Sequence, residues 1–200
     1  MIDLPEDFDP ARDSMLTPKA LRGLVHPIRL RLLDLLQADG PATATSLAHR
    51  IGQSSGVTSY HLRVLAEHGF IVEDTERGTG RDRWWRAPKR STWFTFRMPE
   101  DPGTEETVEQ GEQFIRLVAE DQHRRVLAWI GTLAGRRSEL PSMPWTVSDW
   151  PLQLTLAQAQ ELKIAITDLI LRYRRDPDDP GGRVGTVRAH IALQLTPEEQ

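Results

Sequence analysis

Residues 54–63 combine small hydroxyl side chains, one tyrosine and one arginine, a set suited to hydrogen bonding with DNA. Hydroxyl groups donate to and accept from phosphate oxygens and base edges, and a guanidinium can make two bonds to a guanine or to a phosphate. Small side chains also let the backbone approach the groove closely. The residues of this segment that we expect to face DNA are Ser54, Ser55, Thr58, Ser59, Tyr60 and Arg63.

A second group of candidate contacts lies about twenty residues further on, in the glycine-rich stretch Glu76–Asp82. Phe70, Ile71 and Val72 begin a strand before this stretch, and Arg83–Arg86 returns after it, so a β-hairpin is predicted. Arg77, Arg81 and Arg83 lie at or beside its tip, where cations can bind the phosphate backbone. A solvated turn that happens to be basic is the alternative.

Two short helices must position the first group. Leu47, Ala48 and Ile51 repeat at helical spacing and Gly52 ends that helix, while Ser54 and Ser55 are good N-caps for the next one. The inward stripe of the second helix is expected to hold Val57, His61, Leu62, Val64 and Leu65, and Gly69 follows it. Helix, turn, helix and hairpin in this order predict a winged helix-turn-helix, whose second helix enters the major groove. An ordinary surface helix with a serine cap is the alternative.

Several motifs in the same order resemble the ArsR-type winged-helix transcriptional regulators. They are His26-Pro27-Ile28-Arg29 leading into Leu30–Leu36, then Leu47-Ala48, then Ser59-Tyr60-His61-Leu62 followed by Leu65 and Gly69. The resemblance covers about residues 17–90. It implies a homodimer that binds a pseudo-palindromic operator, usually as a repressor released by an effector.

Charge is distributed unevenly along the 200 residues, whose net charge is −4. Residues 17–97 hold 13 basic and 7 acidic side chains, or +6, whereas residues 1–16 carry −4 and residues 98–200 carry −6. The predicted DNA-binding segment is therefore the basic one, as electrostatic attraction to DNA requires. The acidic arm Met1–Asp13 is interpreted as disordered or as an accessory to dimerisation.

Other chemistries find little support in the sequence. There are no cysteines, which excludes disulfides and thiolate metal ligands. Asp121 and His123 could form half of a metal site, but the helical turns from Val126 to Ala134 add no further histidine or acid. We interpret the remaining histidines of the DNA-binding segment as packed side chains and expect no metal; these are His49, His61 and His68.

No catalytic motif is recognisable, because the chain has no glycine-rich phosphate loop and no serine or carboxylate in a nucleophile motif. We therefore expect neither enzymatic activity nor a cofactor. No run approaches the ~20 apolar residues that a membrane-spanning helix needs, and the acidic start does not resemble a signal peptide. A cytoplasmic protein without a membrane partner is expected.

The second half is expected to begin with a linker, Pro99–Gly103, and one long helix, Thr104–Leu140. Apolar residues close to a heptad spacing predict that this helix packs against a partner subunit. Burial within a single subunit is the alternative. The predicted dimerisation residues are Val108, Ile115, Val118, Val126, Trp129 and Leu133.

The last sixty residues alternate between strand-like and helix-like patterns. Leu152-x-Leu154-x-Leu156 and the alternating residues from Val187 to Leu195 predict two strands, and Thr155 with Gln158 predicts a capping box for a helix through about Arg175. Such a β-α-β unit could hold a small hydrophobic effector against Trp129, Trp145 and Trp150. Tryptophans that simply belong to a core are the alternative.

Taken together, the sequence predicts a mainly α protein with α+β elements. The expected parts are an acidic arm (1–16), a winged helix-turn-helix domain (17–98), a linker with the long dimerisation helix (99–140) and a C-terminal β-α-β unit (141–200). The expected function is that of a homodimeric transcriptional regulator of the bacterial type. A winged-helix module that binds protein instead of DNA is the alternative.

Overall fold

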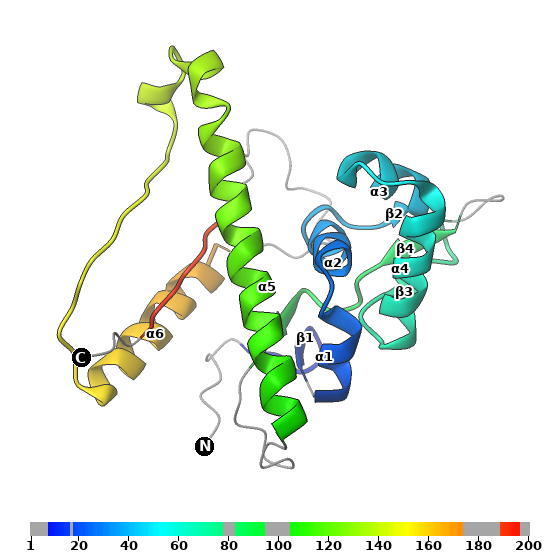
Figure 1. Ribbon diagram of the computed structural model, residues 1–200, viewed down its shortest axis with the longest axis horizontal. Coiled ribbons are helices and arrows are strands. Elements are labelled where there is room, and N and C mark those ends of the chain that lie inside the picture. Colours follow the sequence, from blue (N-terminus) through cyan, green and yellow to red (C-terminus); the bar gives the residue numbers. More distant parts are fainter. Residues whose placement is uncertain (1–7, 17, 78–82, 95–104, 174–188, 197–200) are drawn as a thin grey trace.

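The computed structural model describes residues 8–16, 18–77, 83–94, 105–173 and 189–196. The fold is mainly helical with two small sheets (Figure 1), and the long helix α5 stands between the N-terminal helices and strands on one side and α6 on the other. The elements in chain order are β1 (Asp13–Met15), α1 (Pro18–Leu24), α2 (Pro27–Asp39), β2 (Ala42–Thr43), α3 (Ala44–Ile51), α4 (Ser55–Glu67), β3 (Val72–Glu73), β4 (Trp84–Arg86), β5 (Ser91–Trp93), α5 (Glu105–Ile130) and α6 (Leu156–Leu171), with 3-10 helices Leu133–Arg136 and Leu140–Ser142 between the last two.

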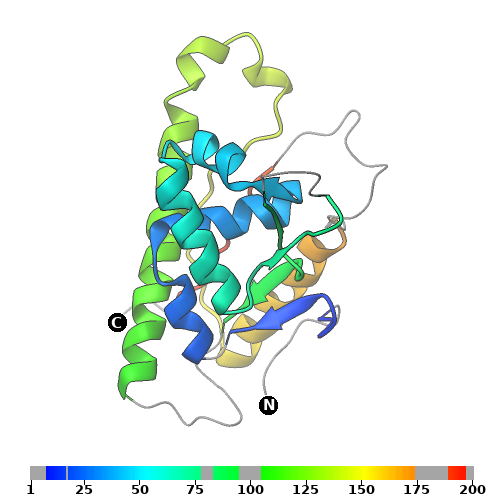
Figure 2. The ribbon, with the colours of Figure 1, turned by 90° about the vertical axis from the view of Figure 1, so that its right-hand side faces the viewer.

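Helices α1 to α4 lie together in one part of the ribbon (Figure 2), and they pack around one leucine-rich core. The predicted pair of helices is confirmed, since α3 ends at Ile51 with Gly52 as its C-cap and α4 begins at Ser55, three residues later, after a turn that Ser54 closes as N-cap. Gly52 has φ 68°, a left-handed conformation that costs a glycine little. The Ser54 hydroxyl accepts from the N–H of Val57, which satisfies a free donor in the first turn of α4. The fully buried side chains of the core include Leu21, Leu32, Leu36, Leu47, Leu62 and Leu65.

The predicted hairpin is also confirmed: β3 and β4 pair antiparallel, with Val72 opposite Arg86. β2 adds on the other side of β4, which gives a three-stranded sheet in the order β2-β4-β3. Trp85, which lies in the middle of β4, is buried in the core, so the sheet is attached to the helices through this strand. Residues 78–82, which include Arg81, lie outside the described residues.

The N-terminal segment differs from the predicted acidic arm. Asp13–Met15 forms β1, which pairs in parallel with β5 through Asp13 opposite Ser91. Asp13 and Leu16 are both buried, Leu16 within the leucine core. The prediction of a separate arm through residue 16 is therefore wrong for residues 13–16, because this strand completes the N-terminal domain.

Helix α5 is shorter than predicted. It ends at Ile130 rather than Leu140, and Gly131 and two 3-10 helices follow it. Glycine is a poor helix former and ends helices readily, which accounts for the early end. The predicted linker 99–103 lies outside the described residues.

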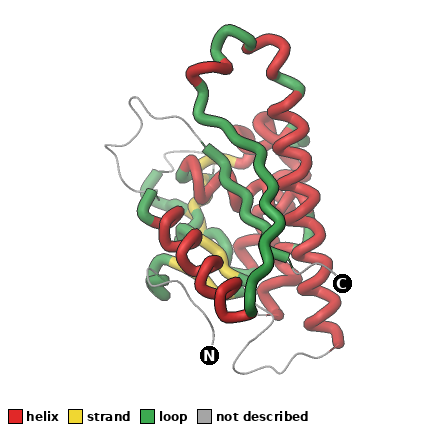
Figure 3. The backbone as a smooth tube through the Cα atoms, turned by 90° about the vertical axis from the view of Figure 1, so that its left-hand side faces the viewer, coloured by secondary structure: helices red, strands yellow, loops and turns green. Residues whose placement is uncertain are grey.

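The predicted β-α-β unit is wrong in its strands. Residues 151–155 and 189–196 have no regular secondary structure, and Figure 3 shows them as loop; Val187 is outside the described residues. The helix between them is confirmed: Thr155 and Gln158 form the predicted capping box, and α6 runs to Leu171. An alternating pattern becomes a strand only beside a hydrogen-bonding neighbour, and neither segment has one in the described chain.

None of the helices in these described parts combines the length and apolar character needed to cross a lipid bilayer.

Candidate nucleic-acid interface

The exposed face of α4 begins at its N-terminus. Ser54, Ser55 and Gly56 are exposed, and the N–H groups of the first turn point out from this end of the helix. The side chain of Tyr60, one turn later, is 57% exposed. This end of α4 therefore presents small polar groups, a phenol and the positive end of the helix dipole to an anionic ligand.

Arg63 lies another turn along the same exposed face. Its Nε donates to the carbonyl oxygen of Ser59 at 3.3 Å, which holds the guanidinium against the helix while the remaining N–H groups stay available. Ser59 itself is half-buried. Arg63 is thus placed as the sequence predicts, on the outside of α4 with a long reach.

Thr58 does not belong to this face. Its side chain is 0% exposed, and its hydroxyl donates to the carbonyl oxygen of Ser54 at 3.0 Å. The prediction that Thr58 contacts DNA is therefore wrong; the residue fixes the first turn of α4 from inside. The buried stripe is Thr58, His61, Leu62 and Leu65, and the first-turn residue Val57, predicted to point inward, is exposed instead.

The described part of the hairpin carries exposed arginines that are paired with neighbouring acids. Arg77 Nε lies 3.1 Å from a carboxylate oxygen of Asp74, and Arg83 Nε lies 3.8 Å from one of Glu73. Both guanidiniums stay more than half exposed, so these ion pairs are weak and can exchange for phosphate.

Two further exposed polar residues of this domain were not among the predicted contacts. Arg86 is exposed on β4, next to the buried Trp85, and Gln53 is exposed in the turn before α4. The alternation along residues 83–86 could have indicated Arg86, since its neighbour Trp85 fills the core. Gln53 has no such signal in the sequence.

A histidine pair supports α4 from behind. The rings of His26 and His61 lie 4.3 Å apart, and His26 Nδ1 accepts from the N–H of Ile28 as the N-cap of α2. Burial lowers the pKa of His26, and the positive charge of Arg29 lowers it further. Burial is also the main cause that lowers the pKa of His61, followed by the charges of His26 and Arg29. Both shifts favour the neutral form of these two packed rings.

The structure does not bring the three predicted effector tryptophans together as a pocket. The rings of Trp129 and Trp145 lie 5.5 Å apart, but Trp145 is exposed and Trp150 is 72% exposed. The prediction of a site enclosed by these side chains is therefore wrong for the described chain. Asp121, considered for a metal, instead accepts hydrogen bonds from Arg124 and Arg125.

The comparisons with known proteins agree with this geometry. A family model described as a helix-turn-helix domain matches residues 24–74, which span α2, α3, α4 and β3. A search of curated proteins finds no significant match to the chain. The chain thus carries a helix-turn-helix domain, a type of domain that suggests a DNA-binding regulator.

Proposed function

We propose that this protein is a sequence-specific transcriptional regulator that binds DNA through α4 and the β3–β4 hairpin, a winged helix-turn-helix of the ArsR type. The carrying observation is the exposed face of α4, where Ser55, Tyr60 and Arg63 project from the second helix of a matched helix-turn-helix domain. In such domains this helix enters the major groove and its N-terminal residues contact bases. Arg77, Arg83 and Arg86 are exposed on the hairpin that follows α4 and supply the contacts to phosphate in this proposal.

The functional unit in this proposal is a homodimer on a pseudo-palindromic operator. Within the described residues, no hydrophobic side chain after Trp85 is buried, although the second half is rich in exposed apolar groups. A segment of this size needs apolar burial to stay folded. A second copy of the chain supplies it, in the way that obligate dimers share a core.

Helix α5 offers a surface for this contact. Its inner side, with Phe114 and Arg125, faces the N-terminal domain. Val108, Ile115, Val126 and Ile130 are exposed and share a stripe centred about 115° around the helix from that side. Of the predicted dimerisation residues, Val118, Trp129 and Leu133 are half-buried. Val118 lies within about 30° of the inner side, Trp129 lies between the inner side and the stripe, and Leu133 follows the end of α5.

The first test is a titration of the full-length protein against pooled genomic fragments, repeated at several salt concentrations. Recovery of one inverted repeat, with affinity that falls steeply in salt, is the expected result. Salt-sensitive binding without a preferred site, or no binding at low salt, would contradict the proposal. Light scattering after size exclusion measures whether the protein is a dimer.

A substitution of Arg63 sharpens this test, because the residue is the long cation on the exposed face of α4. Arg63→Ala is expected to weaken operator binding by about 1–3 kcal/mol and to relax specificity. Arg172→Ala, an equal charge change on an exposed residue after α6, is the control. Equal losses on operator and random DNA would contradict the role of Arg63 in reading bases.

A further inference from the structure

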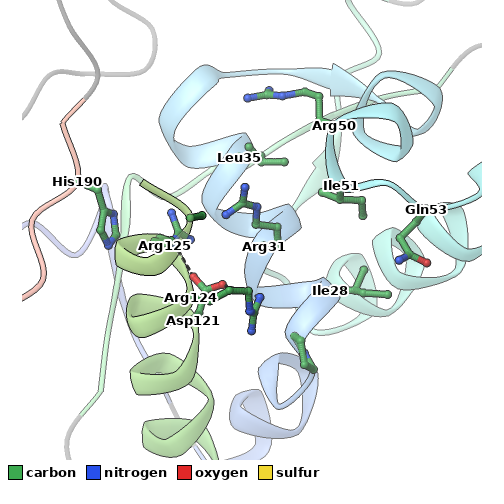
Figure 4. Close-up of a pocket in the computed structure, with 12 residues that line it drawn as sticks. Ile28, Arg31, Leu35, Arg50, Ile51, Gln53, Asp121, Arg124, Arg125 and His190 are labelled. Atoms are coloured by element: carbon green, nitrogen blue, oxygen red, sulfur yellow. Dashed lines mark hydrogen bonds and ion pairs between the residues drawn. The ribbon is translucent and has the colours of Figure 1, made fainter. Parts of the chain in front are cut away.

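A groove of about 790 Å³ lies between α2, α3 and α5 (Figure 4), and no tryptophan is among the described residues that line it. Ile28, Leu35 and Ile51 contribute apolar walls from the side of the N-terminal domain. Guanidinium groups come from both sides, Arg31 from α2 and Arg124 and Arg125 from α5. We call this space the arginine groove.

The charges around the arginine groove do not balance. Arg124 and Arg125 both bind Asp121, with N···O distances of 3.1 and 2.6 Å, and Arg125 also binds Asp34 at 2.9 Å. Arg50, at the rim, pairs with Asp39. Together with Arg31, the groove has four arginines, and they meet three carboxylates. Arg31 forms no ion pair within the described part of the chain.

Arg125 is the most firmly held of the group. Burial alone lowers its pKa, but hydrogen bonds and charges from Asp121 and Asp34 outweigh burial and raise the pKa above the ordinary value. Arg124 is more than half exposed and has one carboxylate partner, so it can turn toward a ligand. Arg31 and Arg124 are therefore the two cations available to an anion in the groove.

We propose that the arginine groove binds a small organic anion, a carboxylate with a compact apolar body such as an aromatic ring. Its volume suits such a molecule, and apolar walls with a few placed polar groups are typical of small-molecule sites. A planar guanidinium matches a carboxylate with two parallel hydrogen bonds, a stronger contact than a neutral amide makes. The apolar walls then cover the ring.

The position of the groove gives the ligand a regulatory role, a step that rests on the proposed function. Asp34 belongs to α2 of the DNA-binding domain, and Arg125 belongs to α5, so their ion pair crosses the joint between these two parts. An anion that binds Arg124 and Arg31 competes with Asp121 and changes the charges around this joint. Ligand binding and DNA binding are then coupled through the angle of α5, by the same factor in both directions.

The test uses isothermal titration calorimetry of the full-length protein with 1-naphthoate and with its neutral analogue 1-naphthamide. Naphthoate is expected to bind below millimolar concentration and about tenfold more tightly than the amide. Arg31→Gln and Arg124→Gln should each weaken naphthoate about five- to tenfold. Arg136→Gln, which removes a guanidinium paired with Glu139 outside the groove, should leave it unchanged.

Three results would overturn the proposal. They are no binding of naphthoate at millimolar concentration, equal affinity for naphthoate and naphthamide, and equal affinity for naphthoate in the two groove variants and the Arg136→Gln control. Circular dichroism of each variant shows whether it is folded. If the groove variants instead weaken all DNA sequences alike while naphthoate does not bind, the groove contacts phosphate.

Operator affinity measured with and without naphthoate tests the coupling separately. We expect naphthoate to change the operator affinity of the wild type but not that of Arg31→Gln. An operator affinity that stays the same although naphthoate is bound would refute the coupling. Because the calorimetry needs no DNA, the groove and the proposed function can fail independently.

Discussion

Replacing Asp13 with asparagine tests how the N-terminal strand is held to the domain. The Asp13 side chain is 1% exposed. It accepts from Arg90 Nε at 3.1 Å and Nη2 at 3.0 Å, from the Ser91 hydroxyl, and from the backbone N–H of Asp9 at 3.0 Å. Asparagine has the same size but no charge, so the substitution removes the carboxylate without leaving a cavity.

The expected magnitude follows from the pKa of this carboxyl group. Burial alone would raise it, but the hydrogen bonds from Arg90, Ser91 and Asp9 and the charge of Arg90 lower the pKa from 3.8 to about 2. One pKa unit corresponds to about 1.4 kcal/mol, so the ionised form contributes about 2–3 kcal/mol to the free energy of unfolding. Because the pKa is lowered on folding, this contribution is complete above about pH 5 and is lost as the pH falls toward 2.

Urea unfolding followed by circular dichroism, at one protein concentration and from about pH 7 to pH 2.5, measures the effect. Asp13→Asn should lower the free energy of unfolding by about 2–3 kcal/mol at pH 7, and the difference should shrink below about pH 4 as the wild type takes up its proton. Asp149→Asn, at an exposed position, is the matched control and should change stability by less than about 0.5 kcal/mol. A difference that is absent at pH 7, or that stays constant down to pH 2.5, would refute the reasoning.

Three further predictions concern the helix-turn-helix domain. Gly23→Ala would place a Cβ 2.5 Å from His68 Cγ, so it should lower the free energy of unfolding by about 1–3 kcal/mol despite the better helix propensity of alanine. In urea unfolding, the double variant with His68→Ala should recover most of this loss, and no recovery would contradict the clash. The pKa values of His26 and His61 are lowered in the folded protein, so below about pH 6.5 the unfolded chain takes up protons more readily than the folded chain, and the free energy of unfolding should decrease as the pH is lowered, by at most about 1.4 kcal/mol per pH unit for each ring. His61→Phe should reduce this slope, and an unchanged slope would count against the role of the pair. Arg77→Ala should weaken DNA binding equally for all sequences and flatten the salt slope by about one unit; a sequence-dependent loss would mean that this residue reads bases.

The helix-turn-helix pair could be predicted because its signals are local. Gly52 ends α3 and Ser54 caps α4 through atoms at most five residues apart, and the Thr155–Gln158 capping box is equally local. The exposed position of Arg63 follows from the helical period once these limits are known. Thr58 could also have been placed inside, since it precedes Leu62 and Leu65 by four and seven residues, but its hydroxyl suggested a contact.

The remaining features depend on residues far apart in the sequence. The β1–β5 pairing joins positions 78 residues apart, and an acidic segment contains nothing that predicts a buried Asp13 bound to Arg90. The prediction of strands around residues 152–156 and 187–195 was wrong for a related reason. An alternating pattern indicates which side chains share a face, but it does not indicate which other strand would pair with the segment. The arginine groove also escaped prediction, because its walls come from residues about ninety positions apart.

The β1–β5 pairing also sets an order of events during synthesis. The contacts among α1 to α4 all lie within residues 18–67, so these helices can pack while the ribosome is still adding the hairpin. Asp13, however, stays an unpaired carboxylate, and the surface it later covers stays open, until Arg90 and Ser91 have left the exit tunnel. The first strand of the domain is therefore the last to be placed, and a chain stopped before residue 90 lacks the residues that close it.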